Sequence, residues 1–130
     1  MDGLCDTCLL LLQPSWQFMN LFEEIISRKV PAEIIWEDSE VLAFRDVRPQ
    51  APVHILIVPK ETISSIASAK EHHAALLGKL LLVAAHLAES EDVARTGFRL
   101  VINNGLEGGQ TISHLHVHLL GGRLFSWPPG

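Results

Sequence analysis

Polar and apolar residues alternate most regularly at residues 114–120, where the sequence is HLHVHLL. Because successive residues of a β-strand point to opposite faces, a strand here places three imidazoles on one face and three apolar side chains on the other. A helix would spread the histidines around its axis and give them no common site. A neutral histidine can act as a nucleophile, a general base or a metal ligand near pH 7. The spacing alone does not decide between a nucleophile and a metal site.

The hydrophobic pattern along the rest of the chain predicts an α+β fold. In chain order it predicts a helix from Asn20, strands at 33–37, 41–45 and 53–59, a helix from about 69 to 88, and strands at 98–104 and 114–120. Asn20 is a candidate N-cap, and Glu23 completes the capping-box pattern. His54 is either a hydrogen-bonded core histidine or a partner of the histidine-rich strand. The order of elements predicts a mostly antiparallel five-stranded sheet with two helices.

A glycine-rich loop at 105–111, GLEGGQT, leads directly into the histidine-rich strand. Glycine permits positive φ angles and lets backbone N–H groups converge on an anion. With Asn103 before it and Thr111 after it, this loop predicts a phosphate cradle. Taken in isolation, it is equally compatible with a plain connection between two strands.

Composition narrows the class of protein. The 130 residues are 48% hydrophobic and 19% charged, which is typical of one globular domain. The net charge of −5, without a cluster of lysines or arginines, disfavours nucleic-acid and anionic-membrane partners. No apolar run is long enough to span a membrane, and the start of the chain lacks the features of a signal peptide. We therefore expect a cytoplasmic protein.

Residues 1–19 are predicted to form an N-terminal extension, with the ordered domain spanning 20–130. The extension is apolar without a clear period and holds the only two cysteines, Cys5 and Cys8, as C-x-x-C. This motif has three interpretations: free thiols in a tail, half of a zinc site, or a redox pair.

The chain resembles the histidine-triad (HIT) superfamily, whose motif is His-φ-His-φ-His-φ-φ, and within it the Hint branch of nucleoside phosphoramidases. The resemblance covers about residues 20–130. Its matches are Lys29-Val30-Pro31-Ala32, Glu37-Asp38, Asp46, Pro49-Gln50-Ala51-Pro52, His54, Val58-Pro59-Lys60, Asn103, Gly105, Gly108-Gly109-Gln110, the triad, Gly121-Gly122-Arg123 and Trp127-Pro128-Pro129-Gly130.

The resemblance implies a homodimer with a HIT-like fold that binds a purine nucleotide. We expect no cofactor or metal, because amides of the glycine-rich loop and cationic histidine can meet the charge of the phosphate. It implies that His116 is a nucleophile, and that water cleaves the resulting nucleotidyl-histidine to release AMP or GMP. His118 would contact phosphate and protonate the leaving amine, while His54 and His114 complete the network. The other implied contacts are Asn103, Gly109, Gln110 and Thr111 for the phosphate or leaving group, Asp46 for the ribose hydroxyls, and Leu21, Phe22, Ile25, Phe44 and Val47 for the base.

Two departures from the family pattern affect these expectations. Zinc-bearing members carry C-x-x-C at the start of the first helix, where this chain has Asn20 and Glu23, so we do not expect zinc there. Hint members commonly have Ser-Val-Tyr before the triad, where this chain has Thr111-Ile112-Ser113. Two alternative functions remain: a nucleotide-binding scaffold with little catalysis, which the apolar extension favours, and a metal protein with histidine ligands.

Overall fold

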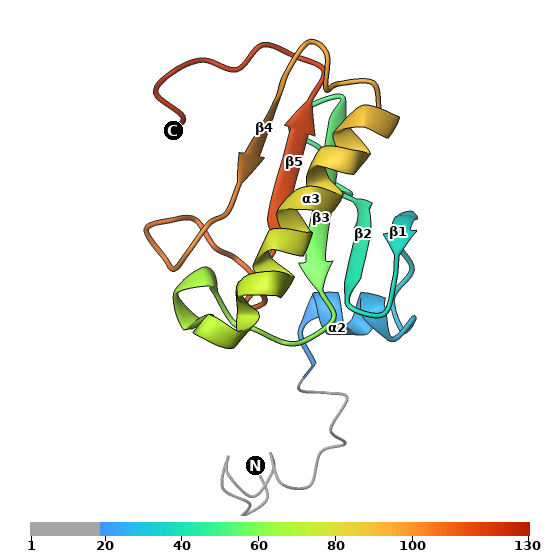
Figure 1. Ribbon diagram of the computed structural model, residues 1–130, viewed down its shortest axis with the longest axis vertical. Coiled ribbons are helices and arrows are strands. Elements are labelled where there is room, and N and C mark those ends of the chain that lie inside the picture. Colours follow the sequence, from blue (N-terminus) through green and yellow to red (C-terminus); the bar gives the residue numbers. More distant parts are fainter. Residues whose placement is uncertain (1–18) are drawn as a thin grey trace, which may run out of the picture.

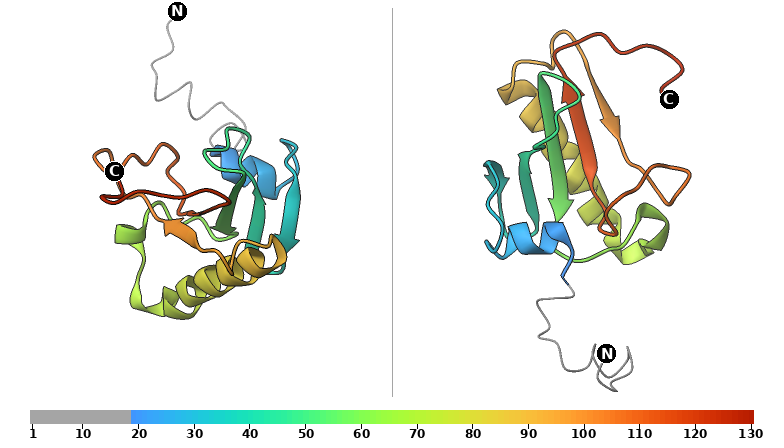
Figure 2. Two further views of the ribbon diagram at one scale, coloured as in Figure 1. Left: turned by 90° about the horizontal axis from the view of Figure 1, so that it is seen from above. Right: turned by 180° about the vertical axis from the view of Figure 1, so that it is seen from behind.

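The computed structural model describes residues 19–130, so the extension up to residue 18 and both cysteines lie outside the described residues. The chain folds into one sheet with a helix on each face (Figures 1 and 2). The elements are α2 (Leu21–Ile26), β1 (Ile34–Glu37), β2 (Val41–Arg45), β3 (Val53–Pro59), two 3-10 turns (Ile66–Ser68 and Glu71–His73), α3 (Ala74–Ser90), β4 (Phe98–Val101) and β5 (Val117–Gly121). The predicted α+β fold is confirmed.

The five strands lie in the order β1-β2-β3-β5-β4, and every neighbouring pair is antiparallel. The central strand, β3, therefore pairs with β2 on one side and with β5 on the other. Its near-continuous apolar sequence follows from this position, because α3 covers one face of the sheet and α2 the other. β5 brings the end of the histidine motif next to β3, which carries His54.

The sheet separates two hydrophobic cores because strand residues alternate between its faces. On β2, Val41 and Ala43 pack in the larger core under α3, while Leu42 and Phe44 pack in a smaller core with Phe22 of α2. The smaller core forms the floor of the candidate site described below. Among the described residues, no helix has the length and apolar character to cross a membrane.

The histidine-rich strand begins later than predicted. β5 starts at Val117, so only His118 of the three histidines lies within regular ladder pairing. The backbone N–H of Leu115 instead donates to the carbonyl of Ile63, 2.6 Å away, and that of His114 donates to Ile112. These bonds bend the chain out of the sheet. The apolar residues of the motif nevertheless face the side predicted for them, since Leu115, Val117 and Leu119 all lie in the larger core.

The long helix also begins later than predicted, at Ala74 rather than near residue 69. The chain before it forms two short 3-10 turns. In the second turn, the imidazole of His73 folds back, and its Nδ1 accepts a hydrogen bond from the backbone N–H of Lys70 at 2.9 Å. His73 is consequently buried, whereas its neighbour His72 is exposed.

Candidate active site

A pocket of about 640 Å³ opens on the α2 side of the sheet, beside the histidine motif. It gathers ten residues expected from the sequence: Leu21, Phe22, Ile25, Phe44, Asp46, Val47, His54, Thr111, His116 and His118. It also takes in residues that were not expected there: Val30, Pro31, Ala32, Arg45, Arg48, Gln50, Leu56 and Ile112. Four expected site residues do not line it: His114, Asn103, Gly109 and Gln110. Apolar side chains form most of the wall, and polar groups gather at the histidine end.

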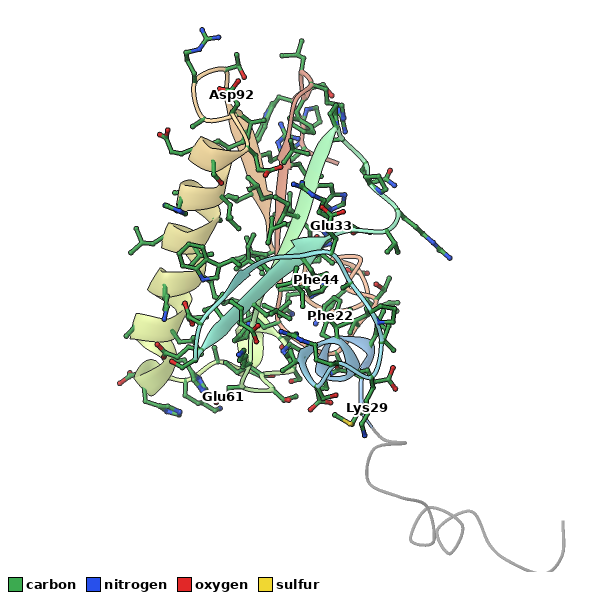
Figure 3. The ribbon with its side chains drawn as sticks, turned by 90° about the vertical axis from the view of Figure 1, so that its right-hand side faces the viewer. Phe22, Lys29, Glu33, Phe44, Glu61 and Asp92 are labelled. Atoms are coloured by element: carbon green, nitrogen blue, oxygen red, sulfur yellow. The ribbon has the colours of Figure 1, made fainter. Side chains whose placement is uncertain are left out.

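Phe22 connects the apolar wall to the histidines. Its ring meets that of His116 edge-on, with the centroids 4.9 Å apart, and that of Phe44 at 5.6 Å. Figure 3 shows Phe22 and Phe44 side by side on the face of the sheet opposite α3. Edge-to-face packing of this kind fixes ring orientation as well as burying apolar area. Phe22 therefore limits the rotation of the His116 imidazole.

Backbone carbonyls determine where His114 and His116 carry their protons. His114 Nε2 lies 2.8 Å from the carbonyl of Pro59, and His116 Nδ1 lies 2.7 Å from the carbonyl of His114. A carbonyl can only accept, so each of these nitrogens is the protonated one. Neutral His116 thus keeps a free electron pair on Nε2, the nitrogen that has no protein partner among residues 19–130. This is the arrangement required of an imidazole nucleophile.

The same reasoning places the proton of neutral His118 on Nε2, the opposite tautomer to that of His116. The backbone N–H of Gln50 donates to His54 Nδ1 at 3.0 Å, so the proton of neutral His54 is on Nε2. His54 Nε2 lies 2.9 Å from His118 Nδ1, to which it donates. His118 therefore carries its own proton on Nε2, which is the one buried side-chain polar atom without a partner in the part of the chain described. The site thus presents an acceptor from His116 and a donor from His118.

Burial keeps these four histidines neutral. It is the largest cause of a lowered pKa at His54, His114, His116 and His118. The pKa of His118 falls furthest, from 6.5 to about 4, because the neighbouring rings of His116 and His54 add to the effect of burial. The Asp46 carboxylate opposes the lowering at His118, and its Oδ2 lies 3.4 Å from His54 Nε2. A bound phosphate would act in the same direction as Asp46, since negative charge favours the protonated ring.

Arg45 lines the pocket, but its charge is already paired. Its guanidinium makes two hydrogen bonds to Glu91, at 2.7 and 3.0 Å, and Nε makes a third to Glu33 at 2.7 Å. The side chain therefore joins the end of β2 to the end of α3 rather than offering a cation to a phosphate. Arg48, in contrast, is exposed at the pocket and has no ion pair with another described residue.

Gln110 holds the glycine-rich loop in place. Its Nε2 donates to the carbonyls of Ser64 and Ile112, and its Oε1 accepts from the N–H of Gly105. Next to it, Gly109 has a φ of +80°, a conformation that favours glycine. These bonds occupy the Gln110 amide and shape the loop that leads to Thr111. The sequence predicts Gln110 as a contact to the nucleotide, but Gln110 does not line the pocket, and the pattern gave no sign of these loop contacts.

Two side-chain clusters among the described residues are compact enough to hold a metal ion: Asp46/His54/His118 and Glu61/His72/His73. In both, hydrogen bonding opposes coordination. A metal on His54 Nε2 or His73 Nε2 would require a proton on the opposite nitrogen, Nδ1. That nitrogen already accepts a backbone N–H in each ring. Neither cluster fits a metal ion in this conformation, which weakens the alternative of a metal protein.

Comparison with known proteins gives consistent results. The HIT domain family model matches residues 27–124. An uncharacterized HIT-like protein of Synechococcus elongatus is 54% identical over 111 residues, covering 85% of this chain and 96% of that protein. The adenylylsulfatase HINT1 of Arabidopsis thaliana is 48% identical over 113 residues, covering 85% of this chain and 76% of that protein. The crystal structure of a HIT family hydrolase from Legionella pneumophila superimposes with a TM-score of 0.83 at 46% identity, covering 85% of this chain and 98% of that one.

Proposed function

Because this chain belongs to the HIT domain family, in its Hint-like branch, we propose that it hydrolyses purine nucleoside 5′-phosphoramidates to AMP or GMP. The observation that carries the proposal is the hydrogen bond from His116 Nδ1 to the His114 carbonyl. It leaves the Nε2 electron pair free at a pocket that has an apolar wall for a base and a buried donor, His118 Nε2, for a phosphate. Asp46, at the same pocket, is the residue we assign to the ribose hydroxyls.

The reaction proceeds in two displacements at phosphorus. His116 Nε2 attacks the α-phosphorus, and the P–N bond to the amine breaks with its electron pair going to nitrogen. The bound phosphate favours the doubly protonated His118 ring, and a proton passes from Nε2 of this imidazolium to that nitrogen, so the leaving group departs as a neutral amine and His118 becomes neutral. Water then attacks the nucleotidyl-His116, returns a proton to His118, and releases the nucleoside monophosphate and free His116. Phosphoryl transfer of this kind depends on positioning and charge stabilisation, which a rigid buried imidazole pair provides.

The proposal is tested by incubating the full chain with adenosine 5′-phosphoramidate and excess chelator. We expect release of AMP at a rate that the chelator does not change. Adenylyl sulfate should be tested in parallel, because the Arabidopsis relative is named for hydrolysis of that compound. Release of AMP from neither compound, with AMP binding retained, would contradict the proposal and favour the nucleotide-binding scaffold.

We also propose that residues 20–130 form a HIT domain that assembles as a homodimer. β4 is an edge strand of the sheet, and Phe98 within it and Ile102 just after it are both more than a third exposed. On α3, the side chain of Leu82 is 72% exposed. An edge strand with exposed apolar neighbours favours pairing with a second strand. Light scattering at micromolar concentration should therefore give twice the chain mass of 14.4 kDa, and a mass of one chain would contradict the dimer.

A further inference from the structure

The side chain of Asn20 makes two contacts at once. Its Oδ1 accepts the backbone N–H of Glu23 at 2.8 Å, which caps α2, and its Nδ2 lies 3.1 Å from Nδ1 of His114. An amide oxygen only accepts and an amide nitrogen only donates, so the cap fixes which end of the amide faces the histidine. Asn20 therefore donates to His114 Nδ1. This contact joins residues 94 positions apart, from the first helix to the triad.

The two contacts of His114 together allow it a single form. Nε2 donates to the Pro59 carbonyl at 2.8 Å while Nδ1 accepts from Asn20, so the ring is neutral with its proton on Nε2. The side chain is fully buried. A second proton on Nδ1 would point directly at the N–H of the Asn20 amide, and the buried ring has no access to water. The amide of Asn20 thereby excludes both the cation and the other tautomer.

Glu23 and Thr62 hold the amide in place. Glu23 Oε1 accepts the backbone N–H of Asn20 at 3.0 Å, and Oε2 accepts the hydroxyl of Thr62 at 2.6 Å. These hydrogen bonds lower the pKa of Glu23, so the carboxylate stays charged and continues to accept. α2 is thus tied to the loop after β3 as well as to the triad. The four side chains Asn20, Glu23, Thr62 and His114 form one connected network, which we call the cap network.

We propose that Asn20 is a positioning residue that holds His114 as the neutral Nε2–H tautomer, so that the cap network orients the nucleophile His116 without a metal ion. This inference rests on the proposed function in assigning the nucleophile to His116. The cap network is connected to His116 through the backbone, because the carbonyl of His114 accepts a hydrogen bond from His116 Nδ1. It is also connected through Phe22, two residues after Asn20, whose ring packs on both imidazoles.

The position of the cap network supports this assignment. Asn20 and Glu23 stand where the zinc-bearing members of the family carry the two cysteines of C-x-x-C. An amide and a hydrogen-bonded carboxylate do not replace thiolates as zinc ligands, since zinc sites of this kind are built from Cys and His. In this chain the side chains of Asn20 and Glu23 are instead engaged in hydrogen bonds with each other's backbone N–H groups, with His114 and with Thr62. We infer that hydrogen bonds here fix α2 against the triad, the task that a metal would perform through its ligands.

The substitution Asn20→Asp tests the proposal because it keeps the cap and reverses the polarity at His114. Aspartate is as good an N-cap as asparagine. Its second oxygen would face His114 Nδ1, and two acceptors cannot bond unless a proton enters between them. Imidazole is more basic than carboxylate, so the proton resides on His114. The nearby groups act in opposite directions, since Glu23 favours this cation and His116 disfavours it. We expect a doubly protonated His114 at pH 7 by ¹⁵N NMR.

A cationic His114 should make His116 a weaker nucleophile for two reasons. It repels the positive charge that develops on His116 during attack, and its own carbonyl becomes a poorer acceptor for the Nδ1 proton of His116. We expect kcat on adenosine 5′-phosphoramidate to fall about 10-fold, the effect of one misplaced hydrogen bond, with KM little changed. Ser65→Asp is the matched control, because Ser65 also caps a helical turn but lies outside the cap network. It adds the same charge and should alter neither the His114 spectrum nor kcat.

Three results would overturn the proposal. They are a wild-type His114 that carries its proton on Nδ1, an Asn20→Asp variant whose His114 stays neutral, and a doubly protonated His114 with unchanged kcat. The first is measured on the wild-type protein and does not depend on the variant folding. If the wild-type protein releases no AMP, the proposed function fails instead, and the NMR spectrum alone then decides the state of His114.

Discussion

Replacing His116 with alanine is expected to abolish release of AMP from adenosine 5′-phosphoramidate, with a loss of about 10⁴-fold or more in kcat. The free Nε2 electron pair of His116 is the nucleophile of the first displacement, and alanine has no substitute for it. Binding of AMP should persist, because the apolar wall and Asp46 remain. Turnover and AMP affinity measured on the same preparation would separate the two effects.

The matched control is His72→Ala. His72 is also an imidazole, but it is exposed and lies in the turn before α3, where its ring contacts that of His73 at a tilt of 43°. This variant should turn over at the wild-type rate. Because His116 is buried, its variant also requires a check by circular dichroism that the fold is retained. Rapid alkaline quenching of wild-type protein should reveal a nucleotidyl adduct on His116; an active His116→Ala variant would exclude this nucleophile.

Much of the fold follows from the sequence because the deciding signals are local. The alternation of histidine with Leu115, Val117 and Leu119 predicts which side chains face the core, and the larger core contains all three apolar residues. The pattern could not predict where regular pairing begins. That point is set by the bond from Leu115 to the carbonyl of Ile63, between segments 52 positions apart. Alternation describes the strand itself, whereas its boundary depends on a distant loop.

Ten of the residues expected at the site line the pocket, but the sequence could not predict how the histidines are protonated. The sequence allows two interpretations of His54, and both describe it in part. It is 6% exposed and hydrogen-bonded within the fold, and it is also the donor that orients His118. The tautomers follow from the backbone groups of Gln50, Pro59 and His114. No residue type in the sequence encodes which backbone group will lie next to an imidazole.

Asn20 illustrates the same limit. The spacing of Asn20 and Glu23 predicts a capping box, and the structure contains one. A sequence pattern of this length describes the backbone of one helix start and uses only the acceptor end of the amide. The donor end reaches His114 and the Glu23 carboxylate reaches Thr62, both through tertiary packing. The prediction of the capping box was therefore right, but a local sequence pattern cannot predict the contact between Asn20 and His114.

Replacing His118 with glutamine is expected to reduce hydrolysis of the phosphoramidate by about 10²–10⁴-fold, the usual contribution of a general acid. Glutamine retains an N–H for a hydrogen bond to phosphate but cannot transfer a proton. We expect the free energy of unfolding of this variant to be close to that of wild type. In the wild-type protein, His118 Nε2 is buried without a partner, an arrangement that costs roughly 1–3 kcal/mol and benefits only the bound state.

The leaving group distinguishes proton donation from a purely structural role for His118. An amine departs poorly from phosphorus unless it is protonated, whereas sulfate departs as a stable anion. The ratio kcat/KM is the appropriate measure, because it covers only the steps up to release of the leaving group and omits the hydrolysis of nucleotidyl-His116. We therefore expect His118→Gln to lower kcat/KM for adenosine 5′-phosphoramidate strongly, and for adenylyl sulfate by less than about 10-fold. An equal loss with both substrates would show that His118 positions the phosphate and gives up no proton in the first displacement.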